Sequence, residues 1–318
     1  MKFMETFSRL VGAGFLLALW TCLSAAQSGK DVRDSMAVTY HFVQIDGVNV
    51  FYREAGPKDA PAILLLHGFP SSSRMFDPLF PLLADKYHLI APDYPGFGHS
   101  EAPPPEKFQY TFEHLANIVD RLTETLRLTK YTMYMSDYGG PIGYRLALAH
   151  PDRVAALIVQ NAVAHDEGLE EKIWAPRRAF WADRASHEDR VRAGLMSAEI
   201  AKMRHLGNSP HPDRYNPDLW TDEAAFLARP GMAQIQIELF YDYRSNVGQY
   251  PAYQEYLREK KPPTLVLWGR YDPNFSVRET DAIGRDVPNA QINILQAGHF
   301  ALDEASAEIA SLIRKFMG

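Results

Sequence analysis

Short apolar runs alternate with longer helical stretches over most of this 318-residue chain, and this alternation limits the possible folds more than any other feature. Runs such as Ile63–Leu66 and Thr264–Trp268 are apolar throughout, which is typical of strands buried on both faces of a sheet. Helical stretches such as Phe112–Leu126 and Gly139–His150 separate the apolar runs. The pattern predicts an α/β fold with a mostly parallel sheet and helices on both faces.

The alternation is interrupted once, between about Val163 and Pro251, where helical stretches rich in charged and aromatic residues follow one another. The strand–helix pattern then resumes at Pro262. We therefore expect one α/β core, residues 36–162 and 252–318, with a helical lid inserted at residues 163–251. A separate helical domain is the alternative, but an insertion flanked by one continued pattern fits the sequence better.

The first 26 residues have the features of a secretory signal peptide. Lys2 and Arg9 precede an apolar stretch from Leu10 to Leu23, and Ser24-Ala25-Ala26 then offers small residues for cleavage. The apolar stretch is shorter than the ~20 residues that span a bilayer. We therefore expect a secreted or periplasmic protein with no stable membrane insertion after cleavage. A membrane anchor, or a lipid anchor through Cys22, is the weaker alternative.

Composition narrows the possible partners and cofactors. The formal net charge is −6 and no run of Lys or Arg is present, so nucleic acid is not an expected partner. Cys22 is the only cysteine, and neither a His-Glu-x-x-His motif nor a phosphate loop occurs. The sequence therefore gives no reason to expect a metal or another cofactor, and it leaves the oligomeric state open.

The segment Met133–Gly140 carries the first candidate for catalysis. Asp137 follows a predicted strand and precedes a predicted helix, with Gly139 two positions later, which is the context that exposes a nucleophile at the top of such a sheet. Ser136 is a competitor, but as nucleophile it would place Tyr134 and Tyr138 where small residues are needed. Asp is also a favoured helix N-cap, so capping is the alternative role of Asp137.

Two later strands also end in polar residues. Asp272 follows the strand Thr264–Trp268, and His299 follows the strand Gln291–Leu295. The chain order Asp137, Asp272, His299 is the nucleophile–acid–base order of hydrolases on this type of sheet. All three would lie at the same sheet edge, where ligands bind in open α/β folds. The three residues are therefore predicted to form a catalytic triad.

A further loop, His67-Gly68-Phe69-Pro70, directly follows the strand Ile63–Leu66. In this type of hydrolase, an oxyanion is held by backbone N–H groups from this loop and from the residue after the nucleophile. The amides of Phe69 and Tyr138 are predicted to fill this role, and His67 is expected to be structural.

These motifs together resemble the epoxide hydrolase and haloalkane dehalogenase branch of the α/β-hydrolase superfamily. The resemblance rests on His-Gly-Phe-Pro, Asp-Tyr-Pro-Gly-Phe-Gly, Ser-Asp-Tyr-Gly-Gly, Trp-Gly-Arg-Tyr-Asp-Pro and Gly-His-Phe, and it covers about residues 38–318. It implies that Asp137 forms a covalent alkyl ester, with Asp272 as the acid and His299 as the base. The implied partners are a small apolar organic substrate and water.

The two enzyme classes differ in the side chain that donates a hydrogen bond to the departing oxygen or halide. Dehalogenases of this branch carry Trp after the nucleophile, where this chain has Tyr138. The stretch Phe240–Asn246 resembles the epoxide hydrolase segment with a ring-opening tyrosine, here Tyr243, although lid packing is an equally good explanation. The stretch for a second tyrosine reads Ala179-Phe180-Trp181-Ala182, in which Trp181 could serve as a halide donor.

Epoxide hydrolysis is therefore favoured, and two groups of alternatives stay open. One is a haloalkane dehalogenase or another hydrolase of esters or C–X bonds. The other is a non-catalytic ligand-binding protein on a hydrolase fold, since fold alone does not fix function.

Overall fold

The computed structural model describes residues 36–318, in which the strands form one eight-stranded sheet of order β1-β2-β4-β3-β5-β6-β7-β8. Strand β2 is antiparallel to β1 and β4, and the other neighbouring pairs are parallel. The predicted α/β fold class is confirmed. The strands are β1 Thr39–Ile45, β2 Val48–Ala55, β3 Ala62–Leu66, β4 His88–Pro92, β5 Tyr131–Ser136, β6 Val154–Gln160, β7 Thr264–Gly269 and β8 Gln291–Leu295.

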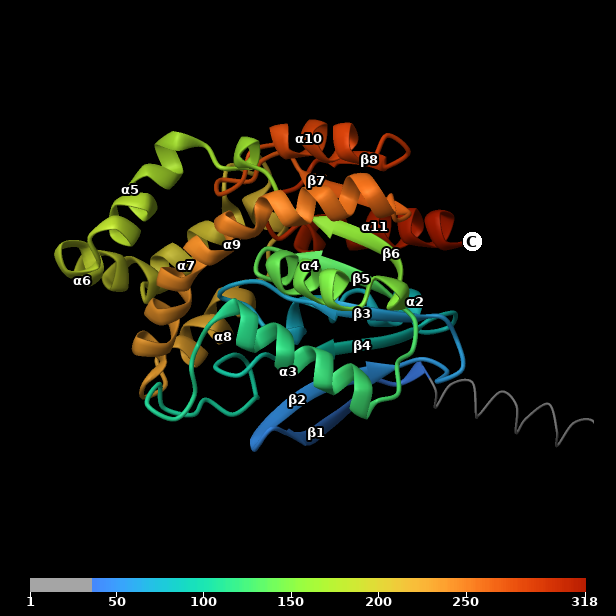
Figure 1. Cartoon of the computed structure of the whole chain (residues 1–318), viewed down its shortest axis with the longest axis horizontal. Helices are drawn as coiled ribbons and strands as arrows, with labels where there is room; N and C mark the ends of the chain where they lie inside the picture. The colour runs from blue at the N-terminus through green and yellow to red at the C-terminus, as the bar shows by residue number, and fades with distance from the viewer. Residues whose placement is uncertain (1–35) are drawn as a thin grey trace, which may run out of the picture.

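Helices cover both faces of the sheet (Figure 1). Strand β3 shows why: Leu64 and Leu66 belong to the core on one face, whereas Ile63 and Leu65 belong to the core on the other. Successive side chains of a strand point to opposite faces, so an entirely apolar strand needs cover on both. One face is covered by α3 Phe112–Thr125, α4 Gly139–Ala149 and α10 Arg278–Asp286, and the other by α2 Phe80–Leu83 and α11 Leu302–Met317.

Five helices, called the inserted helices below, lie between β6 and β7 in the described part of the chain. Figure 1 shows α5 to α8 gathered beyond one end of the sheet, with α9 running from them back along the core. The inserted helices are α5 Glu171–Ala182, α6 Arg184–Leu195, α7 Ala198–Leu206, α8 Asp218–Leu227 and α9 Met232–Lys260. Short 3-10 turns are η1 Ser73–Phe76, η2 Pro151–Arg153, η3 Asp166–Gly168 and η4 Pro212–Arg214.

Helix α9 differs from the sequence-based expectation, because it runs through Pro251 to Lys260 instead of ending near residue 251. A proline inside a helix removes one backbone hydrogen bond, so contacts with the core have to offset that loss. Arg145 of α4 supplies them on both sides of the proline, donating to Asn246 Oδ1 at 2.7 Å and to Tyr253 Oη at 2.6 Å. Helix α9 therefore belongs to the insertion at one end and to the core at the other.

A buried charged cluster joins the inserted helices to the core. The His205 ring of α7 contacts Asp303 of α11 through Nδ1 at 2.8 Å and Glu223 of α8 through Nε2 at 2.9 Å. Burial lowers the pKa of His205, but the charges of Glu223 and Asp303 outweigh that effect and raise it to about 9. The imidazolium form therefore holds α7 against the core.

Residues 188–205 do not form one continuous helix. They are divided between α6 and α7, because the chain breaks at Met196 and Ser197 caps the second helix by accepting a hydrogen bond from the Ile200 amide. Strands β1 and β2 form an antiparallel hairpin, with its turn at Asp46-Gly47. The predicted signal peptide lies outside the described residues. Among residues 36–318, no helix has both the length and the apolar character to cross a membrane.

Candidate active site

Asp137 occupies the sharp turn between β5 and α4, with a positive φ of 47°. A Cβ on Gly139 would come within 2.1 Å of the Leu66 backbone oxygen, so only glycine fits where the elbow passes β3. Met135 occupies a position where a small residue was expected. Gly143 of α4 makes room for it, since a Cβ there would lie 2.3 Å from the Met135 sulfur.

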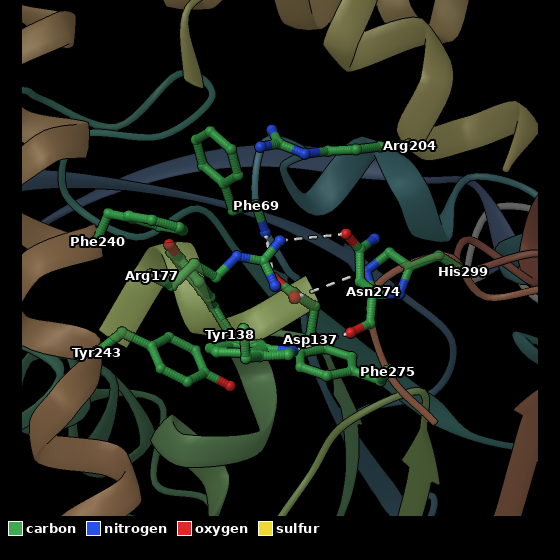
Figure 2. A pocket seen from close by; sticks show the side chains of 11 residues that line it. Phe69, Asp137, Tyr138, Arg177, Arg204, Phe240, Tyr243, Asn274, Phe275 and His299 are labelled. Atoms are coloured by element: carbon green, nitrogen blue, oxygen red, sulfur yellow. Dashed lines mark hydrogen bonds and ion pairs between the residues drawn. The ribbon is translucent and has the colours of Figure 1, made fainter. Parts of the chain in front are cut away.

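The three predicted triad residues meet at this sheet edge (Figure 2 shows Asp137 beside His299). His299 Nδ1 lies 2.8 Å from Asp272 Oδ2, and His299 Nε2 lies 3.6 Å from Asp137 Oδ2. The imidazole thus bridges the two carboxylates. Ser136, the competing nucleophile, is fully buried in β5, and its hydroxyl finds no hydrogen-bond partner in the described chain. The three side chains lie in the order that the predicted triad requires, and Asp137 also lines the cavity described below.

Asp272 is fixed by four hydrogen bonds. Its Oδ1 accepts from the backbone amides of Asn274 at 2.7 Å and Phe275 at 3.1 Å. Its Oδ2 accepts from His299 and, at 2.7 Å, from the Asn161 side-chain amide. A carboxyl group that accepts four hydrogen bonds is fixed in orientation, so it holds the His299 ring in place.

Asn161 is a positioning residue that the sequence analysis missed. It directly follows β6 with a positive φ of 45°. Its side chain accepts from the Gly269 amide at 2.9 Å, and its backbone oxygen accepts from the Asp137 amide at 3.3 Å. Asn161 therefore links the nucleophile elbow to the loop that carries Asp272. The only local signal for it was an Asn, which tolerates positive φ, at a strand end.

The first predicted oxyanion donor is in place. The Phe69 amide donates to Asp137 Oδ1 at 2.8 Å. Gly68 allows this close approach, since a Cβ there would lie 2.3 Å from the Asp137 Cβ. The second donor, Tyr138, directly precedes α4. In the described chain its backbone N–H makes no hydrogen bond and stays available.

His67 is structural in its contacts. Its buried ring accepts a hydrogen bond from the Tyr94 amide at 3.3 Å and stacks on the Tyr94 ring with centroids 4.0 Å apart. Burial lowers the pKa of His67, which keeps it neutral and able to accept that bond.

His299 is held in its charged form by the two carboxylates. Burial lowers the pKa of His299, but Asp272 and Asp137 outweigh that effect and raise it to about 10. The free protein therefore stores one proton on His299, between two negative charges, at neutral pH.

A cavity of about 30 Å³ adjoins the triad. Its wall is mostly aromatic, and it includes two arginines, Arg177 and Arg204, that the sequence analysis did not single out. Figure 2 shows both guanidinium groups on the inserted-helix side of Asp137. The cavity is lined by Phe69, Asp137, Tyr138, Trp174, Arg177, Arg204, Phe240, Tyr243, Asn274, Phe275 and His299.

The two predicted leaving-group residues are placed differently. Tyr243 lines the cavity, and its buried hydroxyl has no hydrogen-bond partner among residues 36–318. Burial and the nearby Asp137 charge hold the pKa of Tyr243 well above its usual range, so the phenol stays protonated. Trp181 does not line the cavity, and its indole N–H donates to the Phe240 backbone oxygen at 3.0 Å. Its placement gives no support to a role as halide donor.

One other group of side chains has the spacing of metal ligands. Asp120, Glu124 and His150 bring ligand atoms within 4.8 Å of one another. Arg153 donates to both carboxylates, at 3.2 and 3.3 Å. Because a guanidinium already balances the two acids, this group is an ion-pair cluster, and none of its members lines the cavity beside Asp137.

Comparisons with known proteins identify the family of this chain. Residues 61–306 match the alpha/beta hydrolase fold family. An uncharacterised hydrolase of Saccharomyces cerevisiae is 41% identical over 279 residues, 86% of this chain and 95% of the relative. A haloalkane dehalogenase of Psychrobacter cryohalolentis is 35% identical over 295 residues, 87% of this chain and 91% of the relative.

Among solved structures, the epoxide hydrolase CorEH superposes with a TM-score of 0.72 at 19% identity, covering 88% of this chain and 99% of that one. At that identity the likeness concerns the fold alone. The family match and the two relatives carry the assignment: the chain belongs to the alpha/beta hydrolase fold family, as a hydrolase similar to haloalkane dehalogenases.

Proposed function

We propose that this protein is an exported epoxide hydrolase that works through a covalent ester on Asp137. The observation that carries the proposal is the placement of the Asp137 carboxylate. Its Oδ1 accepts from the Phe69 amide, and its Oδ2 faces His299. One oxygen is thus held as a future carbonyl, and the other is free to attack a carbon atom.

In the first step, Asp137 Oδ2 bonds to a ring carbon of the epoxide and the C–O bond of the ring breaks. The electron pair goes to the epoxide oxygen, which takes a proton from the Tyr243 hydroxyl. The ester no longer carries the Asp137 charge that stabilises the His299 cation. His299 therefore gives up its proton, which restores Tyr243, and the alkylated enzyme has a neutral base.

In the second step, His299 takes a proton from water and the oxygen of that water attacks Cγ of Asp137. The negative charge develops on Oδ1, where the amides of Phe69 and Tyr138 can receive it. The Cγ–Oδ2 bond then breaks, and the diol leaves with Oδ2 and the proton from His299. The new carboxyl group of Asp137 gives its proton to His299, so the charge pair of the free enzyme returns.

Two side chains at the cavity bear on the choice between an epoxide and a halide. The Tyr243 hydroxyl is protonated and makes no hydrogen bond of ordinary geometry within the described residues, with the Tyr250 hydroxyl close to it, so it can donate to a developing alkoxide. The indole N–H of Trp174, the tryptophan that lines the cavity, donates to the Asn274 backbone oxygen at 3.0 Å. Haloalkane dehalogenation is the second candidate, and the 35% identical relative supports it.

The test is the intact mass of a His299→Gln variant incubated separately with epoxides and with haloalkanes. Without its base the enzyme should stall at the ester. We expect a gain equal to a whole epoxide, mapping to Asp137, and no gain in the matched double variant that also carries Asp137→Asn. A gain equal to a haloalkane minus HX would replace the epoxide assignment and keep the nucleophile. No adduct in the folded variant would favour a ligand-binding protein.

Export is the remaining part of the proposal. It rests on the basic, apolar and small-residue segments of residues 1–26. Expression of the full chain in a Gram-negative host should yield periplasmic protein whose first residue is Gln27. An uncleaved N-terminus in the cytoplasmic fraction would contradict it.

A further inference from the structure

Arg177 of α5 and Arg204 of α7 bring two positive charges to the cavity that contains Asp137. Each has a buried Nη1 atom with no hydrogen-bond partner within residues 36–318. The nearest polar contact of Arg177 is Asn274 Oδ1, 3.5 Å from Nη2. Both side chains are half-buried, and cationic N–H groups removed from water are normally paired with an anion, so the unused Nη1 groups indicate a place for one.

Aromatic rings hold both guanidinium groups in position. The Arg177 guanidinium carbon lies 4.3 Å from the Trp174 ring centroid, and that of Arg204 lies 4.5 Å from the Phe69 ring centroid. Contacts with ring faces orient a guanidinium and leave its N–H edge free. Burial and the neighbouring Arg177 charge lower the pKa of Arg204 to about 10. Both guanidinium groups are thus charged at neutral pH and repel each other, so a bound anion would stabilise the pair.

A second, larger cavity of about 530 Å³ lies between the inserted helices. It shares Arg177, Arg204 and Phe240 with the cavity beside Asp137. Its remaining wall is mostly aliphatic, with His187 and Arg190 and without Asp or Glu. The larger cavity therefore combines apolar surface with positive charge, and the two arginines belong to the walls of both cavities.

We propose that Arg177 and Arg204 form an anion subsite for a substrate carboxylate, so that the substrate is an epoxide carrying a carboxylate within a few bonds of the ring. This inference rests on the proposed function. The two arginines and Asp137 line one cavity of about 30 Å³, which keeps the carboxylate close to the reacting carbon. An apolar substituent would extend into the larger cavity. The predicted small apolar substrate would leave both cations unpaired.

The test begins with binding, which needs no turnover. Cinnamate and its neutral isostere cinnamamide are titrated calorimetrically into the wild-type protein and into the Arg177→Gln and Arg204→Gln variants. Charged hydrogen bonds of this kind typically give a ~10- to 100-fold effect. Cinnamate should therefore bind at least ~10-fold more tightly than cinnamamide to the wild type, and each substitution should abolish most of that preference.

Arg190→Gln is the matched control, because Arg190 lines only the larger cavity. It should change the cinnamate Kd by less than about threefold, as expected of an exposed charge. The Arg177→Gln and Arg204→Gln variants should melt at or above the wild-type Tm, since each removes a half-buried charge that has no ion pair within residues 36–318. A lower Tm with an unchanged cinnamate preference would make the arginines structural. Equal binding of acid and amide by the wild type, or displacement of cinnamate by equimolar bromide, would also overturn the subsite.

Turnover then separates this inference from the proposed function. 3-Phenylglycidate should be hydrolysed with a kcat/KM at least ~10-fold above that of its amide, and Arg204→Gln should remove the difference. If both are hydrolysed equally, the subsite fails and the epoxide hydrolase stands. If cinnamate binds in an arginine-dependent way and neither glycidate reacts, the subsite stands and the epoxide assignment fails.

Discussion

Replacing Asp137 with Asn should release the proton that His299 holds in the free enzyme. His299 Nε2 and Asp137 Oδ2 are 3.6 Å apart. At that separation, Coulomb's law with an effective dielectric constant of about 20 gives an attraction of about 5 kcal/mol. Because about 1.4 kcal/mol corresponds to a tenfold change in an equilibrium constant, the affinity of His299 for its proton should fall about a thousandfold. The pKa of His299, about 10 with both carboxylates present, should fall to near neutral pH.

The assay is an NMR titration of protein with nitrogen-15 in its histidine rings. In the wild type, the His299 signals should be those of an imidazolium from about pH 6 to about pH 9. In Asp137→Asn they should titrate near neutral pH. Tyr138→Phe is the matched control, because it alters the same cavity and keeps the carboxylate.

Two results would refute this reasoning: a neutral His299 in the wild type at about pH 7, or a cationic His299 in Asp137→Asn at about pH 9. The prediction bears on the proposed mechanism, in which alkylation of Asp137 removes the same charge as the Asn substitution. A titration of the expected kind would explain why His299 becomes a base only after the ester has formed.

Three further predictions concern the surroundings of the triad. Asn161→Ala should lower kcat by about 10- to 100-fold, because the hydrogen bond to Asp272 is lost. The same substitution made in the Asp137→Asn variant should leave the ligand Kd unchanged. An unchanged kcat would show that Asn161 does not position Asp272. His205 has a folded pKa of about 9, above its usual ~6.5. Protonation of His205 should therefore contribute about 3 kcal/mol to the free energy of unfolding below pH ~6.5, and this contribution should disappear as the pH rises through about 9. Urea unfolding of wild type and His205→Gln would show this, and a pH-independent difference would contradict it. Gly139→Ala should lower the free energy of unfolding by about 3 kcal/mol through contact with the Leu66 carbonyl, and wild-type denaturant stability would refute the clash.

The triad was predictable because each member has a local signature. Asp137 stands between an apolar strand and a helix with a glycine in the turn, and Asp272 and His299 each follow an apolar strand. Such local context largely determines where a strand ends, and the ends of parallel strands share one edge of the sheet. Short-range pattern was therefore enough to bring together three residues that are far apart in the chain.

Asn161 was not predictable in this way. Its role depends on β6 lying between β5 and β7, which lets one side chain reach the loops after both neighbours. Strand order is a long-range property, and an Asn after a strand carries no sign of it.

The arginines at the cavity were missed for a related reason. Arg177 and Arg204 belong to helices α5 and α7, where Arg is an ordinary surface residue. Only the packing of those helices against α9 and the core turns the two side chains inward. The same long-range contacts carry α9 through Pro251, at which local propensity predicts a stop.

The most direct test of the covalent mechanism is a single turnover in oxygen-18 water with enzyme in excess over an epoxide. The account predicts a diol whose new oxygen is oxygen-16, because it comes from Asp137 Oδ2. The peptide containing Asp137 should gain about 2 Da from the solvent oxygen. Oxygen-18 in the diol of the first turnover, with an unchanged Asp137 peptide, would mean direct attack by water and would contradict the account.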